Sequence, residues 1–226
     1  MPRCDGTAQG SGSARILGGP PDEVTEPLTD LNRRCLDLLA EQARTQCTHV
    51  AVQRIAALWS ALDGAARGRA AGYPYLLFDA GFTDPHRWRR LDGSQINDGP
   101  SDSYTAFFTI PQALSVARLV FVYAWSVARH HHVHARLALG MHPQCARRIA
   151  AHNVLWADQL AEQRWVWLRP RWPHKLQIWE ELLAGAAQGG AAQLRARMYG
   201  MQLLTAEIAA AMHSRERPAA ARDAND

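Results

Sequence analysis

The stretch of sequence that decides the fold is residues 111–151, which read PQALSVARLVFVYAWSVARHHHVHARLALGMHPQCARRIAA. It opens with Pro111, a residue suited to the first turn of a helix, and stays largely apolar through Trp125 before it turns polar. We therefore expect a long helix that begins near residue 111 and continues to Leu139. Gly140 then makes a sharp turn into another helix.

Apolar residues recur at helical spacing through most of the chain. Residues 73–78 depart from this pattern, because they are apolar and lie between glycines. They could form a short strand or an extended segment, and we prefer the extended segment. Residues 165–172, which alternate aromatic residues with arginines, are also expected to be extended. Further helices are predicted over residues 28–46, 52–62, 84–91, 143–152, 154–164, 173–183 and 194–212. The sequence therefore predicts an all-α fold.

A polar stretch rich in Gly, Asp and Ser predicts a linker loop at residues 93–104. It would join an N-terminal helical region over residues 26–92 to a basic C-terminal helical domain over residues 105–214. Flexible tails are expected at residues 1–25 and 215–226.

Composition places the chain among globular proteins. Its 226 residues are 47% hydrophobic and 20% charged, so it can bury a core and is not disordered overall. The four cysteines form no CxxC pair, which argues against a disulfide framework or a cysteine zinc site. The N-terminus lacks the apolar core of a signal peptide, and the most apolar run is too short to span a bilayer. We expect a soluble cytoplasmic protein with no membrane partner.

Positive charge is concentrated in the second half of the chain. Residues 1–110 hold 11 basic and 13 acidic residues, whereas residues 111–217 hold 13 basic and 6 acidic residues. The resulting net charge of +7 indicates a polyanionic or acidic partner, although arginines also solvate helix faces.

The usual signatures of catalysis are absent from the sequence. There is no GxxxxGK[ST], GxGxxG, GxSxG or HExxH motif. Asp79 and Asp84 lie close together, but Asp84 is better explained as a helix cap and Asp79 as a turn residue. No nucleophile stands beside a base, so we predict no enzymatic activity and no cofactor.

Four histidines, His130, His131, His132 and His134, form a cluster. His130 and His134 share a helix face and could chelate a metal ion, but a third ligand and an acid are missing, so we predict no metal site. The alternatives are a polar, exposed helix end and a pH-sensitive interface, in which titrating imidazoles repel one another.

The turn at Gly140 has the pattern of a helix-turn-helix corner. Positions five and one before the turn glycine, and one, six and nine after it, are expected to be buried in this motif. All five are apolar here: Ala135, Leu139, Met141, Ala146 and Ile149. The position four before the glycine is usually small, and Arg136 departs from this rule. An ordinary helical corner would produce the same pattern.

If this corner reads DNA, its second helix presents polar side chains to the nucleic acid. The predicted nucleic-acid-binding residues are Gln144, Arg147, Arg148 and His152. Arginine and glutamine suit contacts to phosphates and base edges.

Tryptophans and arginines are interleaved shortly after this corner. The predicted partner-binding residues are Trp165, Trp167, Arg169, Arg171 and Trp172. Such residues anchor protein interfaces or stack on bases. The competing interpretation places the tryptophans in the core with arginines over them, and we prefer it for Trp156 and Trp179.

The chain resembles the flagellar master-regulator subunit FlhD between about residues 115 and 165. The matching residues are Leu139-Gly140-Met141, Ala146, Ala150-Ala151 and Leu160-Ala161-Glu162, in the family's spacing and without a gap. The preceding helix matches in character. Residues 1–110 have no counterpart in that family.

The resemblance implies an all-α, dimerising bacterial regulator that works with a second subunit, FlhC, to activate transcription. In that family the partner subunit makes much of the DNA contact and carries the zinc. We therefore expect a transcriptional regulator or accessory subunit that forms a homo-oligomer and binds DNA directly or through a DNA-binding partner subunit. The alternative is a non-enzymatic adaptor of a secretion or conjugation apparatus that uses the Trp/Arg-rich segment as its interface.

Overall fold

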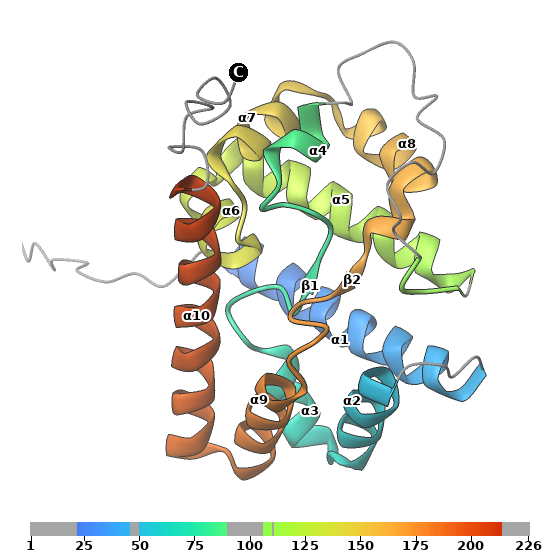
Figure 1. Cartoon of the computed structure of the whole chain (residues 1–226), viewed down its shortest axis with the longest axis vertical. Helices are drawn as coiled ribbons and strands as arrows, with labels where there is room; N and C mark the ends of the chain where they lie inside the picture. Colours follow the sequence, from blue (N-terminus) through green and yellow to red (C-terminus); the bar gives the residue numbers. More distant parts are fainter. Residues whose placement is uncertain (1–21, 46–49, 90–105, 110, 214–226) are drawn as a thin grey trace, which may run out of the picture.

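The computed structural model describes residues 22–45, 50–89, 106–109 and 111–213, and these form the predicted all-α fold (Figure 1). The α-helices are α1 (Asp22–Thr45), α2 (Val50–Ala61), α3 (Gly64–Ala71), α4 (Pro85–Arg89), α5 (Gln112–His130), α6 (His132–Leu139), α7 (Pro143–Ala151), α8 (Val154–Arg164), α9 (Leu176–Gln188) and α10 (Gly190–His213). A 3₁₀ helix, η1 (Trp165–Trp167), precedes β2 (Arg169–Pro170), which pairs antiparallel with β1 (Phe78–Asp79). Within these ranges no helix is long and apolar enough to cross a membrane.

One hydrophobic core joins the two units that the sequence predicts. Buried side chains from Val24 in α1 to Ile208 in α10 belong to a single cluster. Helix α1 packs against α5, and α3 packs against α9, so helices from the first half of the chain lie directly on helices from the second. The predicted linker at residues 93–104 and the tail at 215–226 lie outside the described residues.

The helices differ from the prediction in several places. Helix α3 was not predicted, α9 begins three residues later than predicted and continues past Gly185 to Gln188, and α10 begins at Gly190. Helix α1 begins at Asp22, so residues 22–25 are helical and not part of the predicted tail at 1–25. The long helix predicted to continue to Leu139 is divided at His131, whose φ of −138° and ψ of 62° lie outside the helical range. After this break, α6 buries Ala135, Ala138 and Leu139 against the core.

A non-helical segment, residues 73–82, which we call the extended segment, runs through the middle of the core. Of residues 73–78, which the sequence predicts to be extended, only Phe78 belongs to a strand, and the chain bends at residues 74, 75 and 77. Its side chains from Tyr75 to Phe78 are at most 1% exposed. The backbone N–H of Leu76 donates to the carbonyl of Ala138, 2.7 Å away, and the N–H of Arg171 donates to the carbonyl of Leu77. In Figure 1, β1 and β2 lie at the centre of the view, between α4, α7 and α8 on one side and α2, α3 and α9 on the other.

Asn32 of α1 holds this segment in place. Its side chain is fully buried, and Nδ2 donates to the carbonyls of Ala71 and Tyr75, each 3.0 Å away. Its Oδ1 accepts the N–H of Leu77 at 2.8 Å. One side-chain amide therefore satisfies three buried backbone groups of an irregular segment, which would otherwise be costly to bury.

Helix α10 uses only part of its apolar stripe for the core. Leu204 and Ile208 are buried, whereas Leu194, Met198 and Met212 are between 43% and 58% exposed. Helix α10 packs mainly on α9 and stands along one side of the molecule (Figure 1). It therefore leaves apolar side chains on the surface.

We expect Asn32→Ala to lower the free energy of unfolding by about 3 kcal/mol or more, because each buried backbone group left unsatisfied costs about 1–3 kcal/mol. Urea denaturation followed by tryptophan fluorescence and circular dichroism measures this loss. Arg33→Ala, an exposed neighbour on the same helix, is the matched control and should change the stability by less than about 0.5 kcal/mol. Equal effects of the two substitutions would contradict the role given to Asn32.

Candidate functional site

The corner between α6 and α7 has the burial pattern that the sequence predicts. Gly140 ends α6 in the left-handed conformation, with φ of 64° and ψ of 29°. His142 then caps α7, because its Nδ1 accepts the N–H of Gln144 at 3.2 Å. The five positions expected to be buried are all at most 5% exposed: Ala135, Leu139, Met141, Ala146 and Ile149. Helix α5 packs against both α6 and α7 and so supports the corner on its buried side.

The outer faces of α6 and α7 carry two exposed arginines. Arg136 on α6 and Arg147 on α7 form no ion pair with any described residue. Gln144 is partly buried and lies one turn before Arg147 on the same face of α7. A small residue is usual at the position of Arg136 in a helix-turn-helix. Because Arg136 is exposed, its large side chain does not enter the crossing of the two helices.

The other two predicted residues, Arg148 and His152, take part in packing. The Nη1 of Arg148 lies 3.4 Å from the carbonyl oxygen of Trp88 and donates to it, so this side chain leans towards α4. The ring of His152 stacks on Trp156, with the ring centroids 4.0 Å apart and the planes at 10°. Gln144 and Arg147 therefore share the open face of α7, while Arg148 and His152 lie beside it.

The chain around this corner contains no acid. Residues 103–157 hold five arginines and six histidines but neither Asp nor Glu. The first acids after this stretch, Asp158 and Glu162, both pair with Arg118 of α5. No acid of the described residues pairs with Arg136 or Arg147, and such unpaired positive charge favours the approach of a polyanion.

The histidine cluster lies at the junction of α5 and α6. The Nε2 of His134 is buried and has no hydrogen-bond partner among the described residues. Burial, with a smaller contribution from the nearby His131, lowers the pKa of His134 below its ordinary value of 6.5. Among the described residues, no group of three or more His, Cys, Asp or Glu is placed to hold a metal ion.

The Trp/Arg-rich segment is folded into the protein and is not laid out on its surface. The side chains of Arg171 and Trp172 are 2% and 6% exposed, which corrects their assignment as partner-binding residues, because they present almost no surface to a protein partner. Trp165 and Trp167 are partly buried and lie in η1, where the sequence predicts an extended chain. The ring of Trp167 packs edge-on against Trp88, with the centroids 5.6 Å apart.

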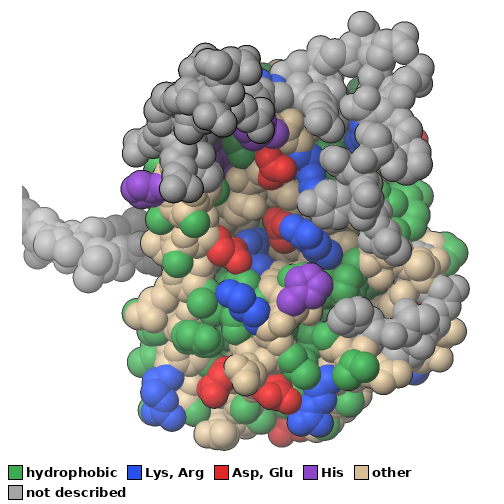
Figure 2. All heavy atoms as spheres, viewed as in Figure 1, with side chains coloured by type: hydrophobic (Ala, Val, Ile, Leu, Met, Phe, Trp, Pro, Cys, Tyr) green, Lys and Arg blue, Asp and Glu red, His purple; other side chains and the backbone are tan. Residues whose placement is uncertain are grey.

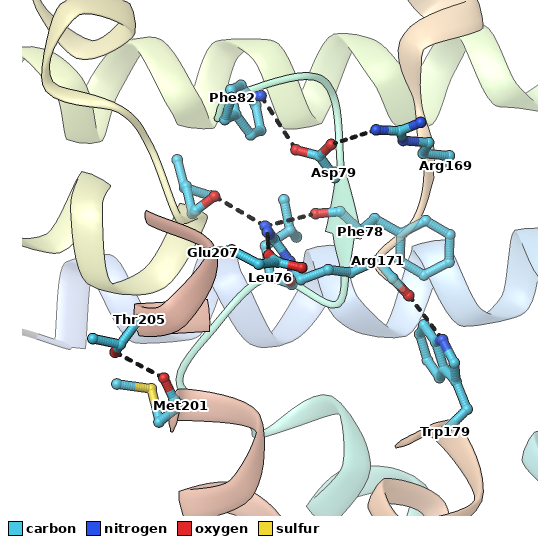
Figure 3. A network of polar contacts seen from close by, with 11 residues as sticks. Leu76, Phe78, Asp79, Phe82, Arg169, Arg171, Trp179, Met201, Thr205 and Glu207 are labelled. Carbon is cyan, nitrogen blue, oxygen red and sulfur yellow. Dashed lines mark hydrogen bonds and ion pairs between the residues drawn. The ribbon is translucent and has the colours of Figure 1, made fainter. Parts of the chain in front are cut away.

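Sequence reasoning missed the role of Arg171, which is the centre of a polar network (Figure 3). Its Nε donates to the carbonyl of Leu76 at 3.0 Å, and its Nη2 donates to the carbonyls of Phe78 and Leu139 at 3.3 and 2.9 Å. Its Nη1 lies 3.5 Å from a carboxylate oxygen of Glu207 in α10. No signal in the sequence separates this arginine from the neighbouring ones, because all four partners are distant along the chain.

The two aspartates have the local roles that the sequence predicts. Asp84 caps α4, since its Oδ1 accepts the N–H of His86 at 2.9 Å. Asp79 closes a turn, since its Oδ1 accepts the N–H of Phe82 at 3.2 Å. The other oxygen of Asp79 lies 3.5 Å from Arg169, the remaining residue of the predicted partner-binding set.

Comparison of the chain with models of known protein families, with curated proteins and with solved structures found no match. The assignment of the corner therefore depends on the residues and the geometry described above.

The left-handed glycine at the corner provides a test of its packing. A Cβ at residue 140 would lie 2.5 Å from Cδ1 of Leu204 and 3.1 Å from Nη1 of Arg171, whereas a Cβ at Gly190, also left-handed, would meet nothing within 4 Å. We expect Gly190→Ala to cost about 1–2 kcal/mol in conformational strain alone. Gly140→Ala should cost clearly more, as measured by urea denaturation. Equal losses would show that the corner is not closely packed against α10.

The lowered pKa of His134 predicts a stability that falls in acid. The unfolded chain binds a proton at this histidine more readily than the folded protein, so stability rises with pH through this range and is lost as pH falls through about 6.5. Urea denaturation at about pH 7.5 and pH 5.5 should show a smaller pH dependence in His134→Gln than in the unmodified protein. His132→Gln, exposed on the same helix, is the control. An unchanged pH dependence in His134→Gln would contradict this assignment.

Proposed function

We propose that the chain is a DNA-binding regulatory protein that contacts the phosphate backbone through the corner formed by α6 and α7. The observation that carries this proposal is the pair of exposed arginines, Arg136 and Arg147, on consecutive helices within an acid-free stretch of chain. Arginines without a protein carboxylate are available for phosphates, and their binding releases counterions from DNA.

The arrangement of helices supports this role. In a helix-turn-helix the second helix lies in the major groove while the first crosses the backbone. Helix α7 presents Gln144 and Arg147 on one open face. Helix α6, which directly precedes α7 in the chain, presents Arg136. In this proposal, Arg147 and Gln144 approach base edges and phosphates, and Arg136 contacts the backbone. Arg148 and His152 hold α7 in position through their contacts with Trp88 and Trp156.

The finer assignment follows the resemblance to FlhD. We propose a cytoplasmic transcriptional activator or accessory subunit that forms a homo-oligomer and acts with a partner subunit on DNA. The exposed apolar side chains of α10 are compatible with such assembly, because surface apolar patches mark interaction sites.

A second candidate function is the adaptor of a secretion or conjugation apparatus. The same exposed residues of α10, Leu194, Met198 and Met212, favour a protein partner. Arg171 and Trp172 are not available to such a partner, so its interface would be α10 and not the Trp/Arg-rich segment.

The proposal predicts salt-sensitive binding to a fluorescent, mixed-sequence DNA duplex. Binding should weaken steeply as salt rises, and the Arg136→Gln/Arg147→Gln variant should reduce the slope of log K against log salt by about 2, or about 0.9 for each lost phosphate contact. Fluorescence anisotropy across a salt series measures the slope, and light scattering gives the mass of the free and bound protein.

The matched control is Arg33→Gln/Arg195→Gln, which removes the same charge from exposed positions on α1 and α10. It should leave the slope within error of the unmodified protein. If both double variants lower binding equally, the interaction depends on net charge and not on the corner. Absence of binding by the unmodified protein at low salt would rule out direct DNA contact and favour the adaptor.

A further inference from the structure

A cavity of about 380 Å³ opens between β2, the start of α9 and the C-terminal part of α10. Its charged lining residues are Asp79, Arg169, Arg171, His174, Lys175 and Glu207. Its volume lies within the range of small-molecule sites in proteins. In Figure 2, basic, acidic and histidine side chains lie next to one another in the middle of this face, over the region where Figure 1 places β1, β2 and α10.

Both carboxylates of the cavity are already paired with arginines. Asp79 is held between the N–H of Phe82 and the guanidinium of Arg169, and Glu207 lies against Arg171. Lys175, in contrast, is exposed and forms no ion pair with a described residue. Among the described lining residues, three permanent cations therefore face two carboxylates, and Lys175 is the cation that has no carboxylate of this set beside it. Such a balance favours a negatively charged ligand.

The start of α9 adds to this positive potential. Lys175 is the N-cap residue of this 13-residue helix, and its side chain makes no capping hydrogen bond, as is also the case at the starts of α5 and α6. By comparison, the side chains of Asp63, His142 and Asn153 cap α3, α7 and α8. The first backbone N–H groups of a helix carry partial positive charge and bind anions when no side chain caps them.

The wall of the cavity is formed by a constrained stretch of backbone. Trp172 is the one non-glycine residue with a positive φ, 54°, in the described part of the chain. It is flanked by Pro173, and Pro170 lines the cavity two residues before it. A left-handed tryptophan is uncommon, and strained backbone of this kind clusters at ligand-binding sites. Its carbonyl accepts the N–H of Lys175 at 3.0 Å, which fixes the lysine at the rim.

We infer that this cavity binds a small organic anion through a phosphate or carboxylate group, with Lys175 and Arg169 as the cations that contact it. Arg171 forms the charged base of the site. This inference goes beyond the proposed DNA contact, which uses Arg136, Gln144 and Arg147. None of these three residues lines the cavity.

The lysine offers a direct chemical test, because Lys175 is the only lysine in the chain. Pyridoxal 5′-phosphate carries both an aldehyde and a phosphate. Its aldehyde condenses with the lysine amine to an imine with release of water, and added borohydride reduces the imine to a stable secondary amine. Peptide mapping by mass spectrometry of the full-length protein then quantifies labelling at residue 175, with the N-terminal amine as internal reference.

We expect labelling of Lys175 to saturate with reagent concentration and to be slowed by inorganic phosphate or by malonate at constant ionic strength. The anion that protects better identifies the preferred group, phosphate or carboxylate. Arg169→Gln should raise the half-protecting concentration by about tenfold or more, since a hydrogen bond to a charged group contributes about 1.5–3 kcal/mol. Arg195→Gln, on an exposed turn of α10 outside the cavity, should leave it unchanged.

A second measurement does not depend on labelling. Phosphate or malonate should raise the Tm of the unmodified protein above that in chloride of equal ionic strength, and Lys175→Gln, a change at an exposed side chain, should abolish the rise. The inference is overturned if Lys175 reacts no differently from the N-terminal amine and neither anion protects it. It is also overturned if both anions stabilise Lys175→Gln as much as the unmodified protein.

Discussion

A buried guanidinium is the constraint on which the rest of this structure depends. An arginine cannot lose its charge in a protein, so Arg171 must find acceptors within the core. It finds the carbonyls of Leu76 and Phe78 in the extended segment, the carbonyl of Leu139 at the end of α6 and the carboxylate of Glu207 in α10. Three parts of the chain thus supply the four acceptors of one side chain, and none can move without leaving a buried polar group unsatisfied.

The same guanidinium lies between the two sites proposed for this protein. Leu139 precedes the left-handed Gly140 of the corner, and Glu207 lines the cavity that also contains Lys175. A change in the pairing of Glu207 would therefore reach the turn of the corner through a single residue. Arg171 is thus the residue through which the two sites are joined by direct hydrogen bonds.

Local regularities of the sequence predicted most of the helices. Features that depend on contacts between distant residues could not be predicted in this way. The extents of α7 and α8 followed from a turn glycine, a capping residue and apolar spacing, all of which act within a few residues. The break at His131 and the burial of Arg171 and Trp172 did not follow. The sequence around Arg171 is typical of a surface segment. Its burial depends on carbonyl groups that are 32 and 95 positions away in the chain. The candidate corner was visible in the sequence, whereas the cavity, assembled from three distant segments, was not.

The extended segment has a consequence for the synthesis of the protein. Its partner Arg171 follows Leu76 by 95 residues, so at ordinary rates of translation the ribosome needs about 5 to 20 seconds to produce it. During that interval the stretch from Tyr73 to Phe82 has been synthesised together with α1 to α3, whereas Arg171 and the helices α9 and α10 that follow it have not. The nascent chain therefore exposes apolar side chains that are buried in the folded protein, and chaperones would have to shield them. Folding is completed only after α10 has emerged from the ribosome.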